Sequence, residues 1–81
     1  MTSQQLAILL GDLKSMKGSD SPLEDLIWYL KNKQELYRQD RNSPMVAVYQ
    51  DEIDLVEKSK SPEALEKTLK EMLEKERAKE T

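Results

Sequence analysis

Carboxylates, sixteen in all, are the most numerous side chains that could do chemistry in this 81-residue chain. Two pairs are spaced by three residues: Asp51 with Asp54, and Glu71 with Glu74. That spacing places both members of a pair on one face of a helix. Di-metal sites in helical bundles add Glu-x-x-His motifs to such carboxylates, but the chain contains no His and no Cys. The segment Asp40-Arg41-Asn42 lacks the Gly and the closing Glu of a calcium loop. The sequence therefore predicts neither a metal site nor a bound cofactor.

Catalytic motifs are also missing from the sequence. The absence of His removes the usual general base. Neither a Gly-x-Ser-x-Gly nucleophile elbow nor a phosphate-binding glycine loop occurs. The Ser residues lie mainly where helices should start or where loops should run, and their hydroxyls have structural roles there. We therefore expect a protein that is not an enzyme, with no catalytic residues and no small-molecule substrate.

Three Ser-Pro dipeptides divide the chain into segments: Ser21-Pro22, Ser43-Pro44 and Ser61-Pro62. Ser is a favoured N-cap residue, and Pro suits the first helical position because its missing N–H would have no partner there. Glu24 also gives the first dipeptide the spacing of a capping box. Four helices are predicted, over residues 3–17, 22–39, 44–58 and 62–77, with a frayed, charged tail over 76–81.

Apolar residues recur at steps of three and four within each segment, as the buried face of a helix requires. The first helix shows this most clearly, with the stripe Leu6, Leu9, Leu10, Leu13 and Met16. Gly18 is expected to end that helix. Gly11 either weakens it or marks a close helix crossing. Residues 45–49 are β-branched enough for a strand, but Pro44 and the helical period favour a helix. The fold class is therefore all-α, a small antiparallel four-helix bundle with short loops, forming a single domain over 1–81.

Composition limits the partners of this bundle. Thirteen basic and sixteen acidic residues give a net charge of −3, which argues against nucleic acid as a partner. The longest apolar run, Leu6 to Leu10, is too short to span a membrane, and we expect a cytoplasmic protein. Small helical proteins without a disulfide or a metal often gain stability from a second subunit. We therefore expect a homo-oligomer.

Charged residues gather on the second and third predicted helices. Folding them back on each other places Lys31 and Lys33 opposite Asp51 and Asp54, so an ion pair is expected between these two sets. Exposed pairs of this kind add little stability. The alternative is a basic docking patch for an acidic partner. It would comprise four residues: Lys31, Lys33, Arg38 and Arg41.

Two apolar residues lie off the predicted stripes. Trp28 falls nearly opposite Leu26 and Leu30 on the helical wheel, and Ile8 is well off the stripe of its own helix. Trp is enriched at interfaces, although a wrapped four-helix fold could also bury part of that face. We therefore add Trp28 and Ile8 to the basic residues as candidate interface positions.

The segment Ser43-Pro44, followed by Tyr49-Gln50 and Ile53, resembles the central turn and second helix start of type III secretion needle subunits. The resemblance covers about a dozen residues, and Pro62 interrupts what would be the long C-terminal helix of a needle subunit. It implies a self-assembling structural subunit. The function favoured by the bundle architecture is instead a small bacterial or phage protein of the regulatory, adaptor or immunity type, which binds a protein partner.

Overall fold

The computed structural model describes residues 1–80, and 82% of the chain is helical. Four α-helices account for this content, namely α1 Ser3–Ser15, α2 Pro22–Gln39, α3 Ser43–Lys58 and α4 Pro62–Glu80. The prediction of an all-α, four-helix fold is confirmed. Each helix begins within one residue of its expected start, and residues 45–49 are helical.

The helix starts use different caps from those expected at the Ser-Pro dipeptides. Ser61 behaves as predicted, since its Oγ accepts a hydrogen bond from the Ala64 N–H. Ser21 makes no side-chain cap, so the capping box predicted with Glu24 is wrong. The reciprocal box lies instead at α1, between Thr2 and Gln5.

The α2–α3 turn is also built differently from the expected Ser43 cap. Ser43 is the first residue of α3, and the Asn42 side chain accepts from the Met45 N–H in its place. Arg41 adopts a φ of 56°, a conformation usually taken by Gly. The backbone of Asn42 donates to the Tyr37 carbonyl, and that of Arg41 donates to the Arg38 carbonyl. This is a Schellman ending with Arg in the position of the Gly.

Two helix ends differ from their predicted positions. Helix α1 stops at Ser15, and Gly18 has no positive φ, so this glycine does not end the helix. Helix α4 continues to Glu80, past its predicted end at residue 77, and the fraying of the charged tail stays a prediction. The Ser3 hydroxyl donates to the Glu80 carboxylate over 2.5 Å, which holds the end of α4 beside the start of α1. Residue 81 lies outside the described part.

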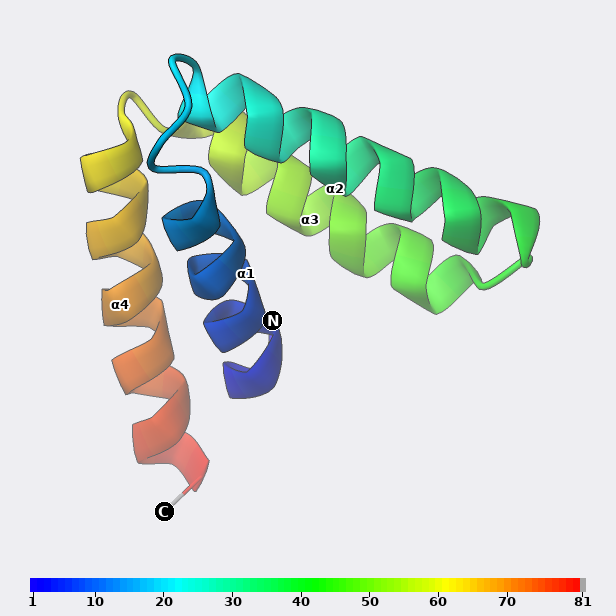
Figure 1. The fold of residues 1–81 in the computed structure, drawn as a ribbon. Helices are drawn as coiled ribbons and strands as arrows, with labels where there is room; N and C mark the ends of the chain where they lie inside the picture. Colours follow the sequence, from blue (N-terminus) through cyan, green and yellow to red (C-terminus); the bar gives the residue numbers. More distant parts are fainter. Residues whose placement is uncertain (81) are drawn as a thin grey trace.

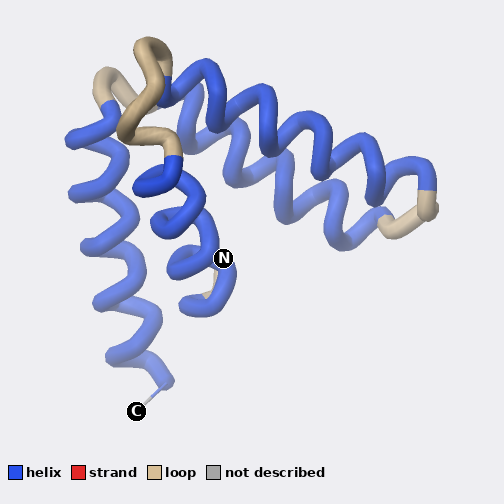
Figure 2. Tube along the Cα trace, viewed as in Figure 1, coloured by secondary structure: helices blue, strands red, loops and turns tan. Residues whose placement is uncertain are grey.

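The helices pack as two antiparallel pairs, α1 with α4 and α2 with α3 (Figure 1). The pairs meet where the 16–21 and 59–61 connections lie, and they diverge from there (Figure 2). The α2–α3 turn and the end of α4 at Glu80 lie at the far ends of the two diverging pairs. The extents of 36 × 33 × 19 Å describe a flat shape about two helices thick.

One apolar core joins the four helices, but it is unevenly distributed. Seven of its side chains come from the α1–α4 pair: Leu6, Leu9, Leu10, Leu13, Leu65, Leu69 and Leu73. The α2–α3 pair contributes four: Leu26, Leu30, Ile53 and Val56. These four lie in the halves of α2 and α3 that adjoin the other pair. The remainder, residues 31–49, forms a distal hairpin that contributes no fully buried apolar residue.

Candidate functional site

A small cleft opens in the angle between the two helical pairs. It has a volume of about 70 Å³ and is lined from α1 and α3 by six residues: Gln5, Ile8, Met45, Val48, Tyr49 and Glu52. Four of these side chains are mainly apolar, and Ile8 is 54% exposed. The α2–α3 pair diverges from α1 here (Figure 1), and of the lining residues Tyr49 also packs against the core.

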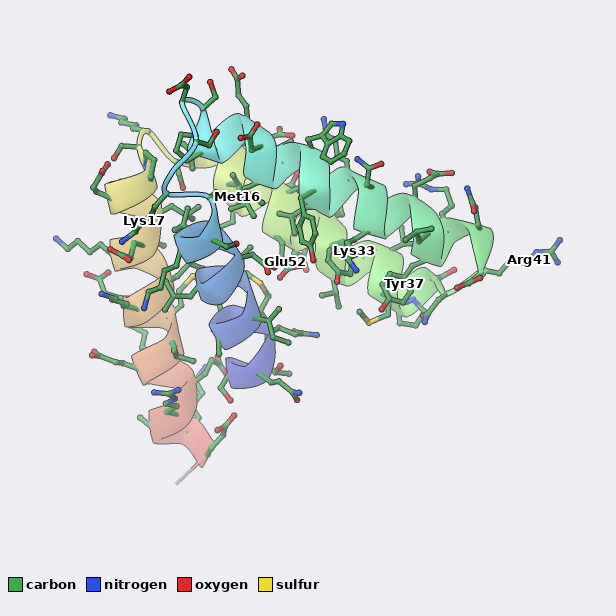
Figure 3. All side chains as sticks on the ribbon, in the orientation of Figure 1. Met16, Lys17, Lys33, Tyr37, Arg41 and Glu52 are labelled. Atoms are coloured by element: carbon green, nitrogen blue, oxygen red, sulfur yellow. The ribbon has the colours of Figure 1, made fainter. Side chains whose placement is uncertain are left out.

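The Glu52 carboxylate lies in this cleft, and Figure 3 shows it in the angle beside α1. Its residue is only 4% exposed. Among residues 1–80, no hydrogen bond or ion pair reaches this carboxylate. Burial, together with the nearby negative charges of Asp12 and Asp51, raises the pKa of Glu52 to about 7. This acidic group therefore changes its charge near neutral pH.

The groups around Glu52 make the cleft acidic. Burial raises the pKa of Asp12 on α1, an effect that Lys33 on α2 partly opposes. Burial and the Glu52 charge also raise the pKa of Tyr49. The Lys33 ammonium lies 5.6 Å from the centre of the Tyr29 ring, in a cation–π contact. It forms no ion pair with a described carboxylate, and its charge offsets the effect of burial on Asp12 only in part.

Polar and aromatic contacts hold the distal hairpin together. Gln34 is 6% exposed, and its Nε2 donates to the Val46 carbonyl at 3.1 Å and to Gln50 Oε1 at 3.0 Å. The Tyr37 and Tyr49 rings stack with centroids 5.6 Å apart. These contacts position Tyr49, and thereby one wall of the cleft.

Two residues of the alternative basic docking patch lie close to carboxylates of α2 and α3. Lys31 is 4.0 Å from Glu57, and Arg38 pairs with Glu35 on its own helix. Arg41 extends from the hairpin turn, whereas Lys33 lies in the angle between the pairs (Figure 3).

The expected ion pair of Lys31 or Lys33 with Asp51 or Asp54 is therefore wrong. Two residues separated by two positions lie about 200° apart on a helix, so Lys31 and Lys33 cannot both face α3. Asp54 instead accepts a hydrogen bond from Gln50.

The two candidate apolar positions occupy different surfaces. Ile8 borders the cleft, where it faces residues of α3. Trp28 is 69% exposed and lies on α2 away from the buried Leu26 and Leu30, as the helical wheel predicted. Leu36, also on α2, is 57% exposed and was not among the predicted positions.

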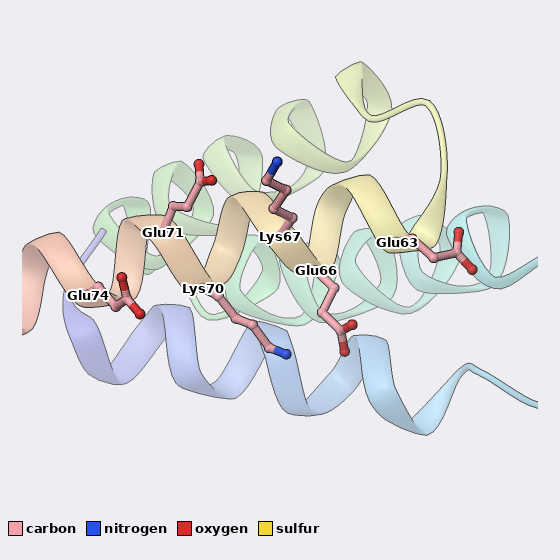
Figure 4. A pocket seen from close by; sticks show the side chains of 6 residues that line it. All are labelled: Glu63, Glu66, Lys67, Lys70, Glu71 and Glu74. Carbon is pink, nitrogen blue, oxygen red and sulfur yellow. The ribbon is translucent and has the colours of Figure 1, made fainter.

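The remaining hollows are less suited to ligands. One of about 280 Å³ is lined by charged side chains of α4 alone, which stand apart along one helix face (Figure 4). Another of about 230 Å³ lies where the two pairs meet and contains the 3.1 Å ion pair of Lys17 with Glu66. No group of three or more potential metal ligands occurs within residues 1–80. None of the helices in that range is both long and apolar enough to cross a membrane.

Comparisons with known proteins identify no relative of this chain. No family model, curated protein or solved structure matches this chain.

Glu52 and Gln34 are the two residues of this region that sequence reasoning missed. Each is a polar residue within a buried helix face. Glu52 follows Tyr49 by three positions and precedes Val56 by four, which is the spacing of the α3 apolar stripe. A charged residue at such a position is the sequence signal that could have identified the cleft.

Proposed function

We propose that this protein is a non-enzymatic binding module that recognises another protein through the angle between α1 and α3. The observation that carries this proposal is the cleft, in which exposed Ile8 and half-buried Met45, Val48 and Tyr49 surround one buried carboxylate. Apolar side chains around a few placed polar groups are typical of recognition sites. The cleft is too small for most metabolites, but it could receive part of a partner's surface.

The exposed surroundings of the cleft extend this surface along the distal hairpin. A protruding helical hairpin leaves its faces available to a partner, as regulatory, adaptor and immunity-type proteins require. We place this activity in the cytoplasm of a bacterial or phage-infected cell. Its effect would come from occupying the partner's surface, with no chemical step.

Site-directed photo-cross-linking tests the location of the interface. Benzoylphenylalanine at Ile8 should give one dominant adduct in an extract of the source cells, and the same group at Lys67 on exposed α4 should not. Ile8→Glu should reduce recovery of that adduct partner by affinity capture at least tenfold. Equal adducts from both positions, or unchanged capture by Ile8→Glu, would contradict an interface in the α1–α3 angle.

A second candidate, the self-assembling subunit, is favoured by the exposure of Trp28. A large aromatic side chain that is 69% exposed is a strong candidate for an interface anchor. Light scattering at micromolar concentration should then give a mass above the 9.4 kDa of one chain. Trp28→Ala should restore the single-chain mass and leave the helical circular dichroism unchanged. A wild-type mass of one chain at all concentrations rules out this candidate.

A further inference from the structure

We propose that the α1–α3 cleft receives one lysine side chain of the protein partner, with its ammonium on the Glu52 carboxylate and its stem along Ile8 and Val48. This inference rests on the proposed binding function and specifies the chemistry that the partner must bring.

The main argument is the unmatched charge at Glu52. The Glu52 residue is 4% exposed, no described residue donates a hydrogen bond to its carboxylate, and the carboxylate oxygens reach solvent only at the cleft surface, because none of the fully buried side-chain oxygens in residues 1–80 is unbonded. Such a charge is costly unless a partner group compensates it. Below its pKa of about 7 a proton neutralises this group, and above it a cation that enters from the open side of the cleft would compensate the charge.

The lining of the cleft selects the kind of cation. Its walls at Ile8, Val48 and Met45 are apolar, and its volume of about 70 Å³ exceeds the roughly 10–15 Å³ that a cavity needs to hold one water. There is room for the end of one side chain. Lysine carries a compact ammonium on a flexible four-carbon stem, which can lie along an apolar wall. The planar guanidinium of arginine is bulkier and prefers two parallel acceptors.

The charged groups near Glu52 favour the same ligand. Asp12 from α1 and Asp51 from α3 both act on Glu52 with negative charge. From α2, Lys33 acts on Asp12 but is held over the Tyr29 ring. Burial and the Glu52 charge raise the pKa of Tyr49, which is therefore neutral near pH 7. The cleft is therefore negative overall whenever Glu52 is ionised.

This arrangement makes ligand binding depend on pH. The pKa of Glu52 is raised to about 7, so the group is mostly protonated at pH 6 and mostly ionised at pH 8. An ammonium binds the ionised form. Its affinity should therefore rise about tenfold from pH 6 to pH 8.

Titration with n-butylammonium chloride, a mimic of the lysine side chain, tests the site directly. Followed by methyl NMR at pH 8, it should shift Ile8, Val48 and Met45 saturably. Glu52→Gln should weaken binding at least tenfold, while Glu57→Gln, an exposed change on the same helix, should leave it unchanged. At equal concentration, n-butanol should not saturate, because it lacks the charge. Absence of saturation in wild type, or equal binding to Glu52→Gln, would overturn the proposal.

A second measurement separates this inference from the binding function itself. If the cross-linked partner binds wild type and Glu52→Gln equally, the binding function stands and the lysine inference is wrong. Loss of partner affinity in Glu52→Gln, matched by loss on replacing one partner lysine with Met, supports the inference. If butylammonium binds but no protein adduct forms at Ile8, the cleft binds a free amine, and the proposal that its ligand is a lysine of a protein partner is wrong.

Discussion

The α1–α4 pair and the distal hairpin of residues 31–49 are both antiparallel helical pairs, but different forces hold them. Leucines from both helices interdigitate along α1 and α4, and six of them are at most 7% exposed. In the distal hairpin the buried contact is Gln34, bonded to the Val46 carbonyl and to Gln50. Hydrophobic burial contributes more free energy than such hydrogen bonds do. The first pair is therefore the stable platform, and the distal hairpin is the part that can adapt.

This difference has a functional meaning. Binding surfaces tend to come from regions of low local stability, because a partner must find groups that are not already satisfied. The cleft lies at the boundary, with Ile8 on the platform and Tyr49 on the distal hairpin. A ligand there would stabilise the hairpin against the platform.

Removing a platform leucine should have the largest effect. Leu69 is fully buried, so Leu69→Ala should lower the free energy of unfolding by about 2–5 kcal/mol. Met45 in the distal hairpin is only half-buried, and Met45→Ala should cost under about 1 kcal/mol. Urea denaturation of both variants measures the contrast. Similar losses at the two positions would show that stability is evenly distributed.

The boundary between the regions should respond to pH through Glu52. Its pKa is raised to about 7 from an ordinary 4.5, so the folded state keeps a proton that the unfolded chain releases between these values. Stability should therefore fall as pH rises from about 4.5 to 7, by about 2–3 kcal/mol from this group, and level off above. Glu52→Gln should remove this fall and exceed wild-type stability by about 2 kcal/mol at pH 8. Denaturation at pH 4, 6 and 8 measures it, and a less stable variant at pH 8 contradicts the prediction.

Gln34 tests how independently the distal hairpin opens. Gln34→Ala removes two hydrogen bonds and should cost about 1–2 kcal/mol. Amide hydrogen exchange should accelerate in residues 35–48, while the amides of α1 and α4 should keep their protection. Gln39→Ala, at an exposed position of the same helix, is the matched control. Uniform acceleration through all four helices would mean that the molecule opens as one unit.

Substitution of Gly11 should change stability least, and it should stabilise the protein where the other core and hairpin changes destabilise it. Gly11 lies mid-way along α1, and a Cβ built there has no atom within 4 Å. Gly11→Ala should therefore increase the free energy of unfolding by about 0.5–1 kcal/mol without changing contacts. The thermal midpoint should rise accordingly. Gly18→Ala, outside the helices, should change it less. A destabilised Gly11→Ala would restore the idea of a close helix crossing at this position.

Local rules predicted the helices because their signals are themselves local. Pro22 and Pro62 are first residues of their helices, and the leucine stripe of α1 became the most buried surface of the fold. The end of α4 was missed because it depends on a contact with Ser3 at the other end of the chain. The positive φ of Arg41 was not predicted because it follows from the geometry of the turn, and Arg is not a residue type that favours this conformation.

The candidate site was predicted less well than the helices. Trp28 and Ile8 were placed outside the core because periodicity reports the direction of each side chain from its own helix. It does not report how two helices are rotated against each other, so the partners of Lys31 and Lys33 were wrong. The cleft depends on the divergence of the two pairs, which no single segment encodes.

The pairing of first and last helices has a consequence for the order of folding. Helices α2 and α3 need only the short turn at residues 40–42 to meet, whereas α1 and α4 must close a loop over residues 16–61. Closing a longer loop costs more chain entropy, so the search for the α1–α4 contact should be the slower event. The hairpin that meets first is nevertheless the one with the weaker interior. The α2–α3 hairpin should become stable only after the leucines of α1 and α4 have packed together. The rate-limiting step of folding should therefore be the contact between the first and last helices of the chain.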